Sequence, residues 1–121
     1  MAKKILVVDD SAVIRQVQET VLGKAGYEVL SANGGQEALG KLATNTVSLI
    51  LTDLNMPGVD GVSLIKQVRA GGNHRMTPIV MVTTESKDTK KQEGKAAGAT
   101  AWVVKPFTPD QLLGVVKRII G

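Results

Sequence analysis

Five short runs of aliphatic and β-branched residues constrain the fold of this chain more than any other feature. Four of the five show little or no polar alternation, which is typical of strands that are buried on both faces of a parallel sheet. Segments with the periodicity of amphipathic helices separate the runs. This alternation predicts an α/β fold, a doubly wound (βα)5 domain with right-handed crossovers. The runs are residues 5–8, 27–30, 47–51, 78–82 and 101–104.

The first and last helices carry the clearest helical patterns. Val13, Val17 and Val21 recur every four residues, and Ile14 and Leu22 widen this stripe, which is predicted to face the core from the first helix. Thr108 has the position of an N-cap before the last helix, and Gln111 falls at N3, where it closes a capping box. We therefore expect the last helix to begin immediately after Thr108.

The second and fourth helices carry weaker patterns. Asn33 and Gln36 offer a weaker copy of the capping box before the second helix. The fourth helix, near residues 89–97, is polar and contains Gly94. Because glycine disfavours helix interiors, we expect this helix to be the least rigid.

The length of 121 residues predicts one domain, residues 1–121. No apolar run approaches the roughly 18 residues that span a bilayer, and the N-terminus lacks the features of a secretory signal. The absence of cysteine excludes disulfides, thiolate catalysis and cysteine-bound zinc. These observations predict a cytoplasmic protein with no membrane partner.

The formal net charge of +4 raises the question of a nucleic-acid partner. The densest basic cluster, residues 87–95, has acidic residues inside it, which is typical of a solvated helix face. With one Phe, one Tyr and one Trp, the chain has no aromatic platform on which bases could stack. We therefore do not expect direct binding to nucleic acid.

Polar residues gather where the predicted strands end. In doubly wound sheets, ligands bind beyond the carboxyl ends of the strands, so this edge is the expected site. It receives three carboxylates, two hydroxyls and one ammonium. The residues are Asp9 and Asp10 after the first strand, Asp53 after the third, Thr83 and Thr84 after the fourth, and Lys105 after the fifth.

This set of groups predicts a metal-assisted phosphoryl transfer. Three carboxylates brought together need a compensating charge, and oxygen ligands without His or Cys favour Mg²⁺. Lys105 forms either a simple salt bridge or a contact with a phosphoryl oxygen. Asp53 stands apart from the adjacent Asp9 and Asp10, which favours it as the nucleophile. The alternative role for Asp9 and Asp10 is to form a turn and cap the first helix.

Four motifs identify the chain as similar to the response-regulator receiver domains of two-component signalling. They are VVDDS at 7–11, LTDLNMPGVDG at 51–61, VTTE at 82–85 and VKPF at 104–107. The resemblance runs from about Lys4 to the last helix and is greatest to the single-domain chemotaxis type (CheY-like). It implies a flavodoxin-like five-stranded parallel sheet with strand order 2-1-3-4-5.

The resemblance implies the phosphoacceptor and the metal ligands. Asp53 corresponds to the residue that accepts the phosphoryl group. Asp10, Asp53 and the backbone carbonyl of Asn55 correspond to direct ligands of Mg²⁺, with Mn²⁺ as an alternative ion. Asp9 corresponds to the residue that acts on the metal through water.

The resemblance also implies the residues of the switch. Lys105 corresponds to the residue that contacts the phosphoryl group, and Thr83 to the hydroxyl that moves toward it. Trp102 stands at the position of the switch aromatic, which is usually Tyr or Phe in the family. The bond between Lys105 and Pro106 corresponds to a cis peptide.

The implied function is a phosphorylation-dependent signalling switch, in chemotaxis. Its donor would be a sensor histidine kinase or a phosphotransfer domain. Its downstream protein target would bind the face made by the fourth helix, fifth strand and fifth helix. The chain would catalyse only its own phosphorylation and dephosphorylation, as a monomer or weak dimer.

Three other readings compete with this one. The chain could be a receiver domain from a larger regulator with a DNA-binding or enzymatic output domain. It could be an aspartate-based phosphatase, although Asn55 stands where that class has its second Asp. A nucleotide-binding fold is disfavoured because no glycine-rich loop follows the first strand.

Other polar and glycine residues receive no chemical role. His74, the only histidine, falls in a Gly- and Asn-rich segment and is predicted to be a solvated loop residue. Gly58 and Gly61 are predicted to set the backbone geometry of the loop after Asp53.

Overall fold

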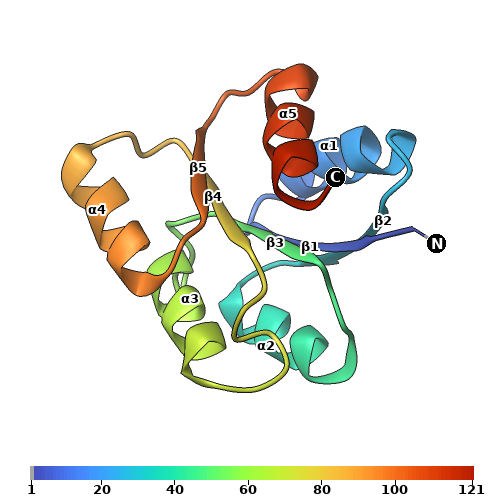
Figure 1. Cartoon of the computed structure of the whole chain (residues 1–121). Helices are drawn as coiled ribbons and strands as arrows, with labels where there is room; N and C mark the ends of the chain where they lie inside the picture. The colour runs from blue at the N-terminus through green and yellow to red at the C-terminus, as the bar shows by residue number, and fades with distance from the viewer. Residues whose placement is uncertain (1) are drawn as a thin grey trace.

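The computed structural model describes residues 2–121 and contains one parallel sheet of five strands (Figure 1). The strand order is β2-β1-β3-β4-β5, which confirms the predicted topology. The strands are β1 (Lys4–Val8), β2 (Glu28–Ala32), β3 (Leu49–Thr52), β4 (Ile79–Thr83) and β5 (Ala101–Val104).

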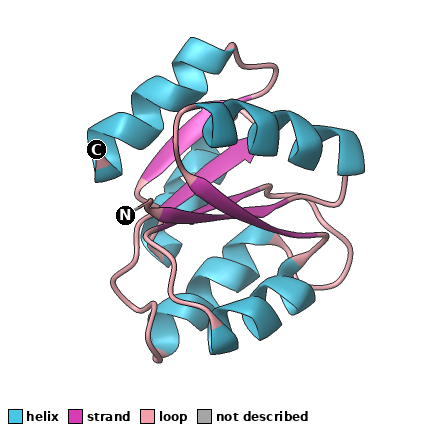
Figure 2. Cartoon of the chain, turned by 90° about the vertical axis from the view of Figure 1, so that its right-hand side faces the viewer, coloured by secondary structure: helices cyan, strands magenta, loops and turns pink. Residues whose placement is uncertain are grey.

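Five helices cover the two faces of the sheet (Figure 2). One face carries α1 and α5, and the other carries α2, α3 and α4 (Figure 1). Within residues 2–121, no helix is both long and apolar enough to cross a bilayer. The helices are α1 (Ala12–Lys24), α2 (Gly35–Thr44), α3 (Gly61–Ala70), α4 (Asp88–Ala97) and α5 (Pro109–Ile120).

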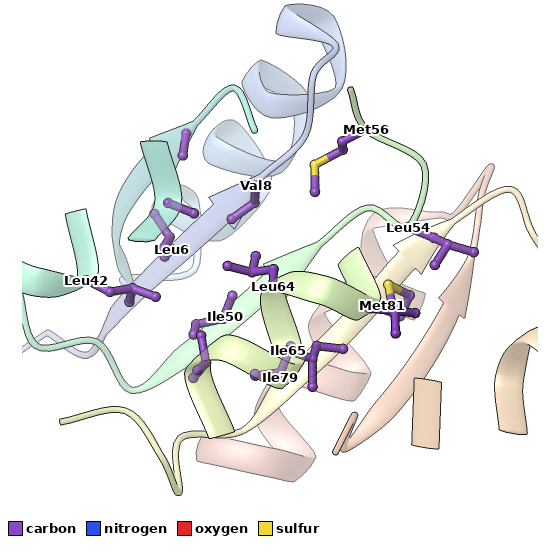
Figure 3. Close-up of a cluster of buried hydrophobic side chains, with 14 of the residues drawn as sticks. Leu6, Val8, Leu42, Ile50, Leu54, Met56, Leu64, Ile65, Ile79 and Met81 are labelled. Carbon is purple, nitrogen blue, oxygen red and sulfur yellow. The ribbon is translucent and has the colours of Figure 1, made fainter. Parts of the chain in front are cut away.

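The central strands are buried on both faces, as their apolar runs predict. Successive residues of a strand point to opposite faces, so Ile5 and Leu6 enter different clusters. Figure 3 shows the cluster beneath α2 and α3, where Ile50 and Ile79 of the sheet meet Leu64 of α3. The two layers of apolar contact hold β1, β3 and β4 in fixed register, and this fixes where each strand ends.

The apolar stripe predicted to face the core from α1 is confirmed at Leu22 and Val21 and is wrong at Val13 and Val17. Val13 is 69% exposed and Val17 is 43% exposed, whereas Gln18 and Leu22 are buried. Ser11 caps the start of the helix, where its side chain accepts a hydrogen bond from the backbone N–H of Ile14 at 3.3 Å. The side of α1 that carries Gln18 and Leu22 faces the sheet, with Ile14 half-buried.

The predicted caps have different outcomes at the two helices. At α5 the capping box is confirmed, since Thr108 and Gln111 exchange two hydrogen bonds of 2.9 and 3.1 Å. At α2 the prediction is wrong, because the N-cap is Gly34, which has no capping side chain. The residue that reaches back to Asn33 is Glu37 and not Gln36, since the Glu37 carboxylate accepts a hydrogen bond from the backbone N–H of Asn33 at 2.7 Å.

The two ends of the described chain meet at the edge of the sheet where the strands begin. The hydroxyl of Tyr27 donates to the carbonyl of Gly121 at 3.2 Å, and the ammonium of Lys3 donates to the carbonyl of Ile120. This contact joins the end of α5 to the start of β1.

The prediction that His74 is a solvated loop residue is also wrong. Its side chain is 5% exposed, and Nε2 accepts a hydrogen bond from the backbone N–H of Val47 at 3.1 Å. Val47 precedes β3, and a buried backbone N–H there needs an acceptor that the imidazole supplies. Arg69 braces the same loop, because its guanidinium donates to the carbonyls of Arg75 and Thr77 at 2.9 and 2.7 Å.

We predict that His74 makes folding stability depend on pH. Burial lowers the pKa of His74 below its ordinary value of 6.5, so the unfolded chain takes up a proton at higher pH than the folded chain. Stability is therefore retained above about pH 6.5 and falls as pH drops below it, by at most about 1.4 kcal/mol per pH unit.

The measurement is denaturant unfolding of the wild type and His74→Gln between about pH 7.5 and pH 5.5. Glutamine offers an acceptor that does not titrate, and the carboxylates common to both proteins cancel in the difference. We expect the wild type to lose more stability than the variant. Parallel pH profiles would contradict the prediction.

Candidate functional site

Three carboxylates meet at the edge where the strands end. One carboxylate oxygen from each of Asp9, Asp10 and Asp53 lies within 4.8 Å of the other two. The sheet causes this meeting, because β1 and β3 are neighbours and Val8 is in register with Thr52. Each strand therefore delivers its next residue to the same place.

Asp9 is fixed through both its backbone and its carboxylate. Its backbone N–H donates to Ala32 at 3.1 Å, and its carbonyl accepts from the guanidinium of Arg15 at 2.6 Å. One carboxylate oxygen accepts from the N–H of Ser11 at 2.9 Å, and the other meets the ammonium of Lys105 at 2.6 Å. Asp9 is 1% exposed, and each of its carboxylate oxygens already has a partner.

Asp53 is held more loosely. Its Oδ1 accepts from the backbone N–H of Leu54 at 2.7 Å, whereas Oδ2 has only the ammonium of Lys105 at 3.4 Å. The residue is 9% exposed, and the short bond at Oδ1 against the long contact at Oδ2 leaves Oδ2 the less constrained oxygen. Asp10 is exposed, and among residues 2–121 its carboxylate has no hydrogen-bond partner.

Lys105 reaches the cluster from the end of β5. Its backbone N–H donates to the carbonyl of Thr83 at 2.8 Å, and its side chain is 11% exposed. The peptide bond to Pro106 is cis. Thr83 is fully buried at the end of β4, and its hydroxyl accepts from the N–H of Glu85 at 3.4 Å.

Trp102 and Asn55 make no side-chain hydrogen bond to the carboxylates among the described residues. Trp102 is half-buried on β5, where its indole N–H donates to the carbonyl of Glu85 at 2.8 Å. Asn55 is exposed on the loop between β3 and α3. The structure thus joins Asp9, Asp53 and Lys105 directly and leaves Trp102 to contact the loop after β4.

Two residues of the site were not predicted for the role they play. The guanidinium of Arg15 donates to the carbonyl of Asp9. The sequence indicates this contact only through the position of Arg15 on α1. Helical side chains tilt toward the N-terminus, so a residue in the second turn points back at the end of β1. Gly61 leaves room for the loop, because a Cβ there would lie 2.4 Å from the carbonyl oxygen of Asp53.

The donor set fits a hard divalent cation. The available groups are carboxylate oxygens within one ligand sphere of each other, and no His or Cys belongs to the cluster. One ammonium against three carboxylates leaves a surplus of negative charge, and Asp10 has no cation of its own among the described residues. Asp10 and Asp53 are therefore the carboxylates of this chain suited to hold Mg²⁺.

Residues 5–117 match the family described as the response regulator receiver domain, across every motif of this site. The chain belongs to that family. Receiver domains are signalling modules, and this assignment confirms the resemblance drawn from the four motifs. It also agrees with the strand order and with the position of the acidic cluster.

Several receiver proteins of known name are similar along the whole chain. Chemotaxis protein CheY1 of Helicobacter pylori J99 is 40% identical over 120 residues, covering 98% of this chain and 97% of CheY1. The structure of chemotaxis protein CheY4 of Vibrio cholerae is 47% identical with a TM-score of 0.96, and the match covers 99% of this chain and all of that one.

A third relative concerns the metal. The receiver domain of sensor histidine kinase PA1611 of Pseudomonas aeruginosa PAO1 is 30% identical, with a TM-score of 0.91. The match covers 100% of this chain and 99% of that one. That structure contains a magnesium ion coordinated in the active-site cleft.

We predict that Gly61→Ala destabilises the receiver fold by about 2 kcal/mol or more, because the new methyl group would press on the backbone of Asp53 and Leu54. Gly114→Ala is the matched control. Nothing lies within 4 Å of a Cβ at Gly114, so this helical substitution should raise stability by up to about 1 kcal/mol. Urea unfolding measures both, and equal effects would contradict the prediction.

We predict that Mg²⁺ raises the melting temperature of the wild type by a few degrees at millimolar concentration, because binding to the folded chain alone stabilises it. Asp10→Asn should abolish this shift. Without Mg²⁺, the same variant should melt higher than the wild type, since it relieves repulsion within the cluster.

The control for the Asp10→Asn variant is Asp110→Asn, which removes an exposed carboxylate from the first turn of α5, outside the acidic cluster. This variant should keep the full Mg²⁺ shift in differential scanning fluorimetry. If Asp10→Asn responds to Mg²⁺ as strongly as this control, Asp10 is not a metal ligand.

Proposed function

We propose that this chain is a phosphorylation-controlled signalling switch that accepts a phosphoryl group on Asp53. The observation that carries the proposal is the unequal environment of the three carboxylates. Both oxygens of Asp9 are occupied and Asp10 is exposed to water, whereas Asp53 is held by one oxygen and presents the other. An oriented, partly desolvated oxygen is suited to nucleophilic attack.

The reaction forms one bond and breaks one. Oδ2 of Asp53 attacks the phosphorus of a phosphohistidine, the P–N bond breaks, and the imidazole leaves with the electron pair. A small acyl phosphate reacts in the same way with loss of its carboxylate. The product is an acyl phosphate on Asp53. Water later attacks the phosphorus, the P–O bond to Asp53 breaks, and inorganic phosphate leaves as the carboxylate is restored.

Charge stabilisation is the main requirement of this transfer. The Lys105 ammonium, 3.4 Å from Oδ2 of Asp53, is within a short movement of a phosphoryl oxygen. Asp10, Asp53 and the carbonyl of Asn55 would hold Mg²⁺ (or Mn²⁺), with Asp9 acting through water. The bound ion would supply positive charge to the phosphoryl oxygens.

Thr83 and Trp102 would carry the signal away from Asp53. The Thr83 hydroxyl, which now accepts from the N–H of Glu85, would donate to the phosphoryl group and draw the loop after β4 toward it. The indole N–H of Trp102 donates a hydrogen bond to the carbonyl of Glu85 in that loop. The result would be a shift between two packed states of α4 and β5.

The downstream protein target would bind the face made by α4, β5 and α5. This face has a hollow of about 290 Å³ beside Trp102 and another of about 480 Å³ between β5 and α5. The phosphoryl donor would be a sensor histidine kinase or a phosphotransfer domain, in chemotaxis signalling in the cytoplasm. The chain would catalyse only its own phosphorylation and dephosphorylation, with no separate substrate.

We predict that acetyl phosphate adds one phosphoryl group to the wild type only when Mg²⁺ is present, as measured by intact mass. Asp53→Asn should gain none. Asp60→Asn is the matched control, since Asp60 follows on the same loop but caps α3, a role that asparagine also performs. It should be phosphorylated as the wild type is.

Phosphorylation of Asp53→Asn to the wild-type level would show that another residue is the acceptor. Absence of any mass gain in the wild type would leave a receiver that signals by binding alone.

A further inference from the structure

The polar helix α4 contacts the rest of the molecule through a glycine. Gly94 is the one residue of α4 that is buried. A Cβ at Gly94 would lie 2.8 Å from Cζ3 and 3.5 Å from Cε3 of Trp102. The six-membered ring of the indole therefore rests directly on the backbone of α4, in a space that even alanine would fill.

The opposite end of the same indole is also fixed. Its N–H, on the five-membered ring, donates to the carbonyl of Glu85 in the loop after β4 at 2.8 Å. The indole thus spans from this loop to α4, with a hydrogen bond at one end and van der Waals contact at the other. A smaller aromatic ring would reach less far between the two.

Glycine within a helix needs a compensating reason, because it disfavours helix formation more than any residue except proline. The carbonyl of Gly94 accepts from the N–H groups of Gly98 and Ala99 at 3.1 and 2.9 Å, so it takes part in closing the end of the helix. Contact with Trp102 supplies the reason, because only a residue without a side chain admits the indole here.

We propose that Gly94 is a positioning residue for Trp102, and that the indole braces α4 against the loop after β4 so that the three move together. This proposal deepens the proposed function, since it names what couples the loop near Thr83 to the surface of α4. A displacement of the Glu85 carbonyl pulls the indole N–H, and the ring then presses on α4 at Gly94.

The structure also indicates where the ring goes when Gly94 is filled. The hollow of about 290 Å³ beside Trp102 lies between α4 and β5. An added methyl group at position 94 would push the ring away from α4, toward this hollow and solvent. The residues that line the hollow are Lys91, Lys95, Ala99, Thr100, Ala101 and Trp102.

The first test is tryptophan fluorescence of unphosphorylated Gly94→Ala. Trp102 is the only tryptophan of the chain, so the emission reports this ring alone. We expect a red-shifted emission and an increase of about twofold in acrylamide quenching as the indole becomes exposed. The matched control is Gly40→Ala in α2, where nothing lies within 4 Å of the new Cβ and the emission should stay unchanged.

A second measurement separates displacement of the ring from simple loss of stability. In the wild-type background, Gly94→Ala should lower the melting temperature by several degrees. With Trp102→Phe also present, the shorter ring leaves room for the methyl group, and the same alanine should raise the melting temperature because the helix gains a better helix former. The change of sign is specific to contact between the two residues.

Unchanged emission and quenching in folded Gly94→Ala, or the same loss of melting temperature in both backgrounds, would overturn the proposal. Neither measurement requires phosphorylation. If acetyl phosphate fails to modify Asp53, the proposed function fails and the contact between Gly94 and Trp102 still stands. If phosphorylation succeeds while Gly94→Ala has no effect on Trp102, the proposed role of Gly94 is wrong and the proposed function stands.

Discussion

Two carboxylates placed at the buried edge of a parallel sheet are costly unless a cation faces them. In this receiver domain the cation is the ammonium of Lys105, at 2.6 Å from Asp9 and 3.4 Å from Asp53. This pair of contacts links the ends of β1, β3 and β5, strands that are not all neighbours in the sheet. The geometry of the acidic cluster depends on it, because no other ammonium or guanidinium group of the described chain contacts these carboxylates.

The fold and the main site residues were predictable because the local patterns and the global topology agree. Unalternating apolar runs are compatible with few arrangements other than a parallel sheet covered on both faces. Once strands and helices alternate, the topology brings Asp9, Asp53 and Lys105 to one edge whatever their separation in sequence. The capping box at the start of α5 was equally predictable, because Thr108 and Gln111 lie within one helical turn of each other.

The wrong predictions concern positions where the sequence pattern allows two local structures and tertiary packing selects one of them. On α1, the predicted apolar stripe is wide enough to include both the exposed Val13 and the buried Leu22, and packing turns the side with Gln18 toward the core. The Gly- and Asn-rich neighbours of His74 predict a solvated loop, whereas the buried imidazole bonds to Val47, a residue 27 positions earlier in the chain. Contacts at long range, such as that between Gly94 and Trp102, leave no periodic trace in the sequence.

The contact between the two ends of the described chain has a practical consequence for handling this protein. Lys3 and Gly121 lie at the edge where the strands begin, opposite to the edge that carries the carboxylates. An affinity tag, a fluorescent protein or a surface linker attached at either terminus would project away from Asp53. Immobilised molecules would therefore present their acidic edge to the solution in a common orientation, which suits binding measurements with a tethered receiver.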